Sequence, residues 1–188
     1  MNQNKRTALP KALPLSELPE ADQRLATKAL EASAQAYAPY SGFAVGAAVR
    51  TKAGNIYTGA NIENAAYAVV TCAEVSAIAA ANAAGDFEIE SIAVAGHKFV
   101  DPQDSTQLVT PCGRCRQMIN EAGEVAGTDV QVFSCNGQLT RIVKASITQL
   151  LPAAFGPEML GITGVWPDMK SKLHTTVDRL LAGKPRRP

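Results

Sequence analysis

The sequence is poor in aromatic residues, in histidine and in net charge. Phe, Trp and Tyr make up 5% of its 188 residues, and 18 Lys and Arg against 17 Asp and Glu leave a net charge of +1. A nucleic-acid-binding protein is expected to carry a clustered basic face and aromatic side chains on which bases stack. The scattered charges and few aromatics therefore argue against a nucleic-acid partner and favour a small-molecule ligand.

Long apolar runs are also missing. No uninterrupted stretch reaches the roughly 18 apolar residues of a membrane-spanning helix, and the segment from Met1 to Leu13 has no apolar signal core. We therefore expect no membrane partner and a cytoplasmic protein. In such a reducing compartment the 4 cysteines are expected to act as thiolates rather than as disulfides.

The hydrophobic pattern alternates between helical and extended segments. Apolar residues recur every three or four positions from Leu18 to Ala36, which predicts a helix ended by Pro39. The next segments predict strands at 44–50 and 55–60, a helix at 71–84 and a strand at 89–95. A helix is predicted at 113–122, ending near Gly123. Strands at 129–134 and 139–143, joined by a type I′ turn at Asn136-Gly137, and a short helix capped by Ser146 follow. This alternation predicts an α/β fold with a mixed sheet covered by helices.

The domain organisation is expected to be simple. Residues 1–14 mix charges with two prolines and are predicted to be a flexible extension. Residues 15–160 are predicted to form one domain, and 161–188 a tail. A short amphipathic helix is expected in the tail, either packed on its own domain or in contact with another subunit; its apolar stripe is Leu173, Val177, Leu180 and Leu181.

The spacing of the cysteines points to a metal. Cys112 and Cys115 form a C-x-x-C pair, which is typical of zinc sites and of redox pairs alike. The two histidines are remote in sequence, and Cys135 has no ligand spacing to another residue, so Cys72 is the best third ligand. Three protein ligands leave the fourth zinc position for water, as in catalytic sites.

A carboxylate accompanies the first cysteine. Glu74 lies two residues after Cys72, near the start of the predicted helix, where it could act as a general base for water at the open metal position. The pattern C-A-E…P-C-x-x-C resembles the zinc deaminase signature, with cysteine in place of the first histidine. A structural three-cysteine site or a buried thiol cluster is the alternative.

Three thiolates give one Zn²⁺ a formal excess of negative charge, which weakens its effect on bound water. Both Cys72 and Cys112 lie where helix N-termini are predicted, so backbone N–H groups and the helix dipoles would stabilise the thiolates. Arg114 and Arg116 flank the ligands and are expected to compensate charge by donating hydrogen bonds to sulfur.

From about Tyr37 to Leu160 the chain closely resembles the small, tetrameric class of cytidine deaminases. The motifs that carry the resemblance are the segments 37–43, 61–67, 71–74, 111–117 and 150–158, in the family's order and spacing. The resemblance implies a three-layer sandwich with about five strands, one Zn²⁺ per subunit, a homotetramer, and hydrolysis of cytidine or deoxycytidine to the uracil nucleoside and ammonia in pyrimidine salvage.

The resemblance also implies roles for individual residues. Asn61 and Glu63 would hold the ribose 3′-hydroxyl, and the Ala73 N–H would bind the base carbonyl. Phe43 would line the nucleoside pocket, while Phe155 and Tyr67 would reach a neighbouring subunit's site. Each has a plain structural alternative: Asn61 and Glu63 as surface loop residues, and the phenylalanines as core aromatics.

One position departs from the family. Arginine often follows the catalytic glutamate there, whereas this chain has Val75. That departure and the Cys-Gly-Arg-Cys-Arg-Gln stretch also resemble blasticidin S deaminases, so a modified cytosine nucleoside is an alternative substrate. A non-catalytic zinc-binding homologue and a polynucleotide-editing deaminase are further alternatives, the last disfavoured by the near-neutral charge.

Overall fold

A computed structural model describes residues 10–162 and 164–182 of the chain. The chain divides into two compact units, with the boundary between Phe155 and Gly156, whereas the sequence places the end of the main domain at 160. Most of the extension predicted to be flexible, residues 1–9, lies outside the described residues. Its last part does not behave as a free tail, because Leu13 pairs with Ile142 through hydrogen bonds of 2.9 and 2.8 Å.

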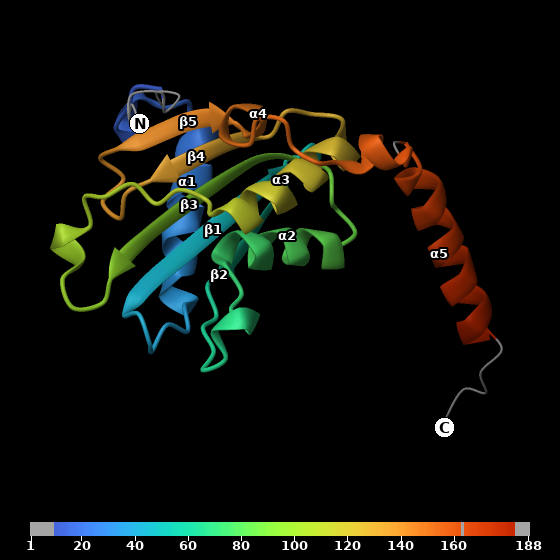
Figure 1. Cartoon of the computed structure of the whole chain (residues 1–188), viewed down its shortest axis with the longest axis horizontal. Helices are drawn as coiled ribbons and strands as arrows, with labels where there is room; N and C mark the ends of the chain where they lie inside the picture. The colour runs from blue at the N-terminus through green and yellow to red at the C-terminus, as the bar shows by residue number, and fades with distance from the viewer. Residues whose placement is uncertain (1–9, 163, 183–188) are drawn as a thin grey trace, which may run out of the picture. The chain divides into compact units, whose positions relative to one another are not determined.

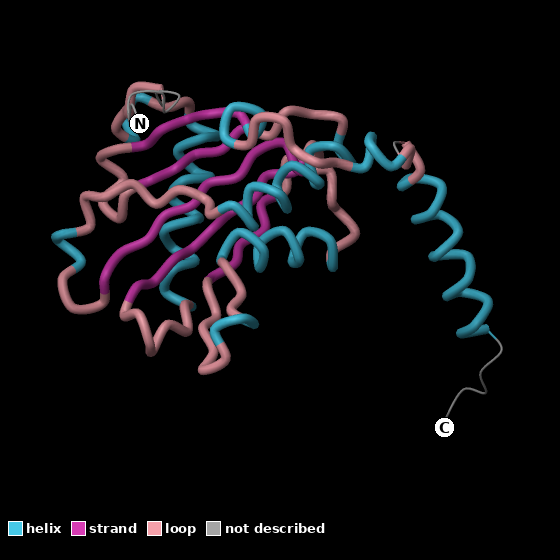
Figure 2. Tube along the Cα trace, viewed as in Figure 1, coloured by secondary structure: helices cyan, strands magenta, loops and turns pink. Residues whose placement is uncertain are grey.

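The first unit is built on one mixed five-stranded sheet, as predicted. The strands are β1 (Phe43–Thr51), β2 (Ile56–Ala60), β3 (Ile89–Lys98), β4 (Gln131–Cys135) and β5 (Ile142–Ser146). Their order in the sheet is β2-β1-β3-β4-β5 (Figure 2). All neighbours run antiparallel except β3 and β4, which are parallel. The parallel pair needs a crossover, and the helix between these strands supplies it.

Helices cover both faces of this sheet (Figure 1). One face carries α1 (Glu20–Ala32), whose Leu25, Ala26 and Ala29 are fully buried against β1, β3 and β4. The other face carries α2 (Ala73–Ala83) and α3 (Gly113–Ala126), with the short α4 (Ile147–Leu150) beside them. The predicted three-layer sandwich is therefore confirmed.

Small residues let the helices approach the sheet closely. At Gly59 of β2, an added Cβ would overlap the backbone of α2 at Ser76 and Ala77. At Gly46 of β1, it would overlap the backbone of α1 at Ala29. Alanine fills much of the core between these layers, so the backbones themselves set the distance between helix and sheet.

Two predicted boundaries are wrong. Helix α3 continues past Gly123 to Ala126 and ends at Gly127, which takes the left-handed φ of 61°. The predicted type I′ turn at Asn136-Gly137 is absent, and β5 begins at Ile142 rather than at 139. Gly137 has no positive φ. Glycine fits there because an added Cβ would clash with the Gly96 carbonyl and the Ser105 side chain.

Other local predictions are confirmed. Ser146 caps α4 in a full capping box, accepting from the Gln149 N–H while the Gln149 side chain accepts from the Ser146 N–H. Short 3-10 turns complete the first unit at Leu15–Glu17, Ser33–Gln35, Tyr67–Val69 and Pro102–Asp104.

The second unit contains a 3-10 turn, Pro157–Leu160, and α5 (Trp166–Ala182). The predicted apolar stripe lies on α5, which has no buried residue; Leu173, Val177, Leu180 and Leu181 are all exposed. Among the described residues, no helix combines the length and the apolar character that a membrane crossing requires.

The close contact at Gly59 gives a stability prediction. Gly59→Ala forces α2 away from β2 and is expected to lower the free energy of unfolding by about 1–3 kcal/mol. The neighbouring Thr58 is exposed, so Thr58→Ala should change it by no more than about 0.5 kcal/mol. Urea unfolding followed by circular dichroism measures both; equal effects of the two variants would contradict this account of the packing.

Candidate metal centre

Two helix N-termini bring three cysteines together on one face of the sheet. Cys72 is the N-cap residue of α2, Cys112 is the N-cap residue of α3, and Cys115 lies in the first turn of α3. Their sulfur atoms all lie within 4.8 Å of one another. The predicted cluster is therefore present, although 40 residues separate its first and second members in the sequence.

The geometry of this cluster fits a zinc ion. Zn–S bonds of about 2.3 Å place two sulfurs of a tetrahedral site about 3.8 Å apart, and the Sγ atoms of Cys112 and Cys115 are 3.6 Å apart. Within the described part of the chain, no further His, Cys, Asp or Glu group joins the three. The donor set is the three-ligand kind that leaves one tetrahedral position to water or substrate.

The pKa values of two of the sulfurs are shifted in opposite directions. A hydrogen bond from Cys115 lowers the pKa of Cys72 to about 6, against the opposing effect of burial. The same hydrogen bond, together with burial, raises the pKa of Cys115. Cys72 lies at the N-terminus of α2, where the helix dipole supports negative charge on its sulfur.

The two nearby arginines differ in what they contact. Arg114 donates to the Val70 carbonyl at 3.0 Å and its charge helps to lower the pKa of Cys72. The predicted hydrogen bond from Arg114 to sulfur is not among these contacts, and charge compensation by Arg114 stays a prediction. Arg116 instead donates to the Pro111 and Leu150 carbonyls, at 2.9 and 3.0 Å. Its predicted hydrogen bonds to sulfur are not among its contacts, because its side chain runs back from the cysteines toward α4.

Glu74 lies beside the cluster and is shielded from water. It occupies the first turn of α2 and is 4% exposed. Burial raises the pKa of its carboxyl group, and hydrogen bonds from its own N–H and from the Cys115 thiol oppose this rise only in part. A buried carboxylate with a raised pKa next to a metal position has the properties of a group that takes up and returns a proton.

The predicted sugar-binding pair follows the end of β2, next to the start of β1 and the loop before it. The Asn61 amide ties the start of β1 in place, accepting from the Val45 N–H at 2.9 Å and donating to the Phe43 carbonyl at 3.1 Å. Glu63 accepts from the Tyr40 N–H at 2.9 Å and the Ser41 N–H at 3.2 Å. Both of these N–H groups donate to Oε2 of Glu63. Neither residue is a free loop side chain.

The remaining predicted residues vary in exposure. Ala73 is fully buried as the first residue of α2, a position whose N–H has no partner within the helix. Phe43 is half-buried, with its ring over Gly96. Tyr67 and Phe155 are 74% and 58% exposed. The exposed aromatics are therefore not core residues of this chain.

Some contacts around these residues were not predicted. The Tyr67 ring packs edge-on against Tyr40, with 6.1 Å between the ring centroids. The Gln117 side chain donates to the Phe155 carbonyl at 2.6 Å. The sequence signal for Gln117 was its place next to the C-x-x-C pair, which does not reveal its partner.

The other candidates for metal binding lie elsewhere. Cys135 is fully buried on the α1 side of the sheet, and burial raises its pKa to about 12. His97 is within hydrogen-bond distance of the Ser33 hydroxyl, at 3.1 Å. Cys135 and His97 therefore lie outside the cluster of three cysteines.

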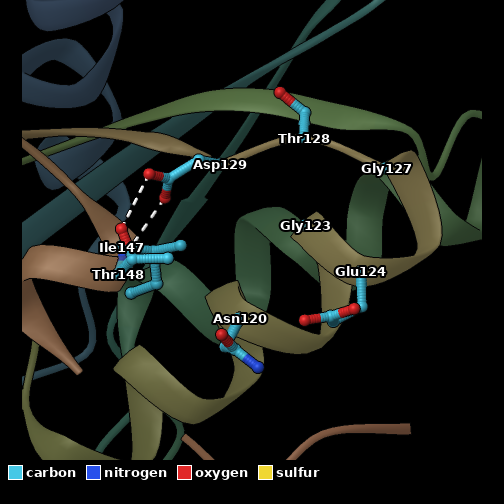
Figure 3. Close-up of a pocket in the computed structure, with 8 residues that line it drawn as sticks. All are labelled: Asn120, Gly123, Glu124, Gly127, Thr128, Asp129, Ile147 and Thr148. Atoms are coloured by element: carbon cyan, nitrogen blue, oxygen red, sulfur yellow. Dashed lines mark hydrogen bonds between the residues drawn. The ribbon is translucent and has the colours of Figure 1, made fainter. Parts of the chain in front are cut away.

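A hollow of about 270 Å³ opens at the far end of α3 (Figure 3). There Asp129 accepts hydrogen bonds from the hydroxyl and the N–H of Thr148, at 2.7 and 3.1 Å, and so caps α4. None of the predicted site residues lines this hollow, which also contains no cysteine. It is separate from the sulfur cluster.

Comparison with known proteins finds similarity to cytidine deaminases. The family model described as the cytidine and deoxycytidylate deaminase zinc-binding region matches residues 19–128. A cytidine deaminase of Halalkalibacterium halodurans is 39% identical over 136 residues, which cover 72% of this chain and 95% of the relative. A cytidine deaminase of Mycobacterium tuberculosis is 40% identical over 141 residues, covering 74% and 93%.

A blasticidin-S deaminase of Bacillus cereus is 36% identical over 112 residues, covering 59% of this chain and 76% of that protein. Among solved structures, a cytidine deaminase from Burkholderia pseudomallei superposes with a TM-score of 0.63 at 37% identity, covering 73% of this chain and 100% of the other. With the sulfur cluster and the buried carboxylate in the matched region, the chain belongs to the zinc-binding cytidine and deoxycytidylate deaminase family.

Proposed function

We propose that this protein hydrolyses cytidine or deoxycytidine to uridine or deoxyuridine and ammonia, as a cytoplasmic enzyme of pyrimidine salvage with one Zn²⁺ per subunit. The observation that carries the proposal is the buried Glu74 carboxylate beside three sulfurs within 4.8 Å of one another. A purely structural zinc site has no need of a buried acid next to it, and burying one is unfavourable without a compensating role.

Cys72, Cys112 and Cys115 would hold the metal, which supplies an acidified water and so a nucleophile at neutral pH. The Glu74 carboxylate would accept one proton from the attacking water and deliver it to N3 of the base. It would then take the remaining proton of that water from the C4 hydroxyl and deliver it to the departing amino group. Water adds at C4, the C4–N4 bond breaks, and ammonia leaves. The raised pKa of Glu74 suits both directions of this transfer, because the carboxyl group can hold the proton between steps.

Substrate binding would use the residues around the start of β1. The Glu63 carboxylate, which the Tyr40 and Ser41 N–H groups hold in place through Oε2, would accept from a ribose hydroxyl. Asn61 would add its amide, and the N–H of Ala73 would bind the base carbonyl. Phe43 provides the apolar wall. Hydrogen bonding from the Ser41 hydroxyl lowers the pKa of Glu63, so it stays an acceptor at neutral pH.

We propose a homotetramer, as the resemblance to the small class of cytidine deaminases implies, and the exposure of two aromatics in one chain supports contact between subunits. Phe155 and Tyr67 present large apolar surfaces to solvent. Burying them in a neighbouring subunit's site would exclude water from the substrate and remove this exposure.

A modified cytosine nucleoside such as blasticidin S is the second candidate substrate. The similarity to a blasticidin-S deaminase and the presence of Val75 after Glu74 support it. The reaction at C4 would be the same, and the difference would lie in the sugar-binding contacts. A non-catalytic zinc-binding homologue is disfavoured by the intact Glu74.

The metal content gives the first test. The wild-type chain is expected to hold one zinc per subunit, and Cys115→Ala to lose it, since two remaining thiolates bind zinc weakly. Cys135→Ala is the matched control and should keep the wild-type zinc content. Mass spectrometry of purified protein measures the metal, and a Cys115→Ala protein with full zinc content would refute this ligand set.

The second test removes the proton carrier. Glu74→Gln is expected to retain zinc while kcat for cytidine falls by about 10²–10⁴-fold, because the amide cannot accept the proton. The loss of ultraviolet absorbance on deamination measures the rate. Turnover at the wild-type rate would take Glu74 out of the mechanism.

The third test concerns sharing of the site between subunits. Phe155→Ala should raise KM for cytidine by about tenfold through lost apolar contact. Co-expression with the inactive Glu74→Gln chain should restore a low KM in mixed oligomers, since the intact Phe155 then comes from the neighbour. Absence of this complementation in oligomers shown by light scattering to be mixed would indicate that Phe155 acts within its own chain.

A substrate series distinguishes the alternatives. The rate constants kcat/KM are compared for cytidine, deoxycytidine, cytosine, adenosine, blasticidin S and single-stranded DNA. We expect the free cytosine nucleosides to be preferred. A preference for blasticidin S would support the second candidate, and a preference for DNA would overturn the nucleoside assignment.

A further inference from the structure

The side chain of Arg116 closes a ring around the C-x-x-C pair. Arg116 directly follows Cys115 on α3, and its Nε donates to the Pro111 carbonyl at 2.9 Å. Pro111 is the residue before Cys112. The backbone from Pro111 to Arg116, closed by this hydrogen bond, therefore forms a loop that contains both cysteines of the pair.

The same guanidinium group reaches a rigid part of the fold. Its Nη1 donates to the carbonyl of Leu150, the last residue of α4, at 3.0 Å. A carbonyl at a helix C-terminus has no partner within the helix and is a strong acceptor for a cation. Helix α4 is itself fixed by its capping box and by the buried Ile147 and Leu150. Arg116 thus connects the Cys112 loop to an anchored element.

Cys112 needs such support more than the other two cysteines. It is exposed, whereas Cys115 is buried and Cys72 is intermediate. As the N-cap of α3, its carbonyl accepts from the Arg116 N–H at 2.9 Å, and its side chain makes no capping hydrogen bond. An exposed ligand loses conformational entropy when it binds a metal, and a further restraint on the residue before it reduces this loss.

We propose that Arg116 is a positioning residue for the metal centre: it holds the Pro111 carbonyl so that Cys112 is already placed for the metal before the metal binds. This inference rests on the zinc site of the proposed function. It assigns Arg116 a role through backbone carbonyls, in place of direct charge compensation at sulfur.

The adjacent Gln117 provides a matched control. Its amide donates to the Phe155 carbonyl and does not contact the Pro111 loop. Substituting both residues by methionine keeps an unbranched apolar stem and removes all side-chain donors. The two variants therefore differ in which carbonyl is released and in one positive charge, and Arg116→Lys retains that charge.

The experiment measures zinc affinity by competition with a chromogenic chelator, on the full-length protein, with no substrate present. Arg116→Met is expected to weaken zinc binding by about 10–100-fold, the range found for residues that orient metal ligands. Gln117→Met is expected to leave zinc affinity unchanged. Arg116→Lys should fall between wild type and Arg116→Met, because one ammonium group serves two separate carbonyls less well than a guanidinium.

Two further measurements separate positioning from general loss of structure. In Arg116→Ala, millimolar guanidinium is expected to restore part of the zinc affinity by refilling the site of the lost group, whereas sodium at the same ionic strength should not. With excess zinc, Arg116→Met should recover near-wild-type KM for cytidine. Wild-type zinc affinity in Arg116→Met, or equal losses in Arg116→Met and Gln117→Met, would overturn the proposal.

These readouts also distinguish this inference from the proposed function. If the wild-type protein binds zinc but does not deaminate cytidine, the zinc competition still tests Arg116. If cytidine is deaminated and zinc affinity is insensitive to Arg116, the positioning role alone is refuted.

Discussion

The structure depends on the meeting of two helix N-termini over one face of a mixed sheet. Cys72 begins α2 and Cys112 begins α3, so the positive ends of two helix dipoles point at the same three sulfurs. Concentrating thiolates in one place is unfavourable without opposing charge, and the helix ends and Arg114 supply it. A divalent cation then neutralises most of the negative charge that the three thiolates carry.

The close packing of the sheet and helices maintains this arrangement. Glycine at 59 and at 46 lets β2 approach α2 and β1 approach α1 without a side chain between the backbones. Movement of α2 by the width of a methyl group would shift Cys72 and Glu74 together relative to α3. The alanine-rich core is thus part of the metal geometry, and the low dielectric that it creates around Glu74 raises the pKa of that carboxyl group.

Much of the site was predictable because it is encoded locally. The order Cys72-Ala-Glu74 and the Cys112-x-x-Cys115 spacing determine which side chains share a helix end, and the predicted strands and helices bring those ends to one face. The partner of each arginine was not predictable. A flexible side chain with five donors can reach a sulfur or a carbonyl within the same radius, and the choice for Arg116 depends on where α4 lies.

Glycine positions show a similar limit. Gly123 and Gly137 both resemble chain-reversal signals, yet neither has a positive φ, and each is small because a neighbouring backbone comes close. Only Gly127 ends α3 in the left-handed conformation. Sequence patterns do not separate a glycine needed for its φ from one needed for its size, because the second requirement is set by residues distant in the chain.

We expect three sulfurs to hold one zinc and to leave its fourth position to an oxygen atom of water. X-ray absorption at the zinc edge on the metal-loaded protein tests this most directly. The account predicts about three sulfur neighbours near 2.3 Å and one oxygen neighbour near 2.0 Å. Four sulfur neighbours, with no oxygen, would mean a closed structural site and would contradict a catalytic metal in this protein.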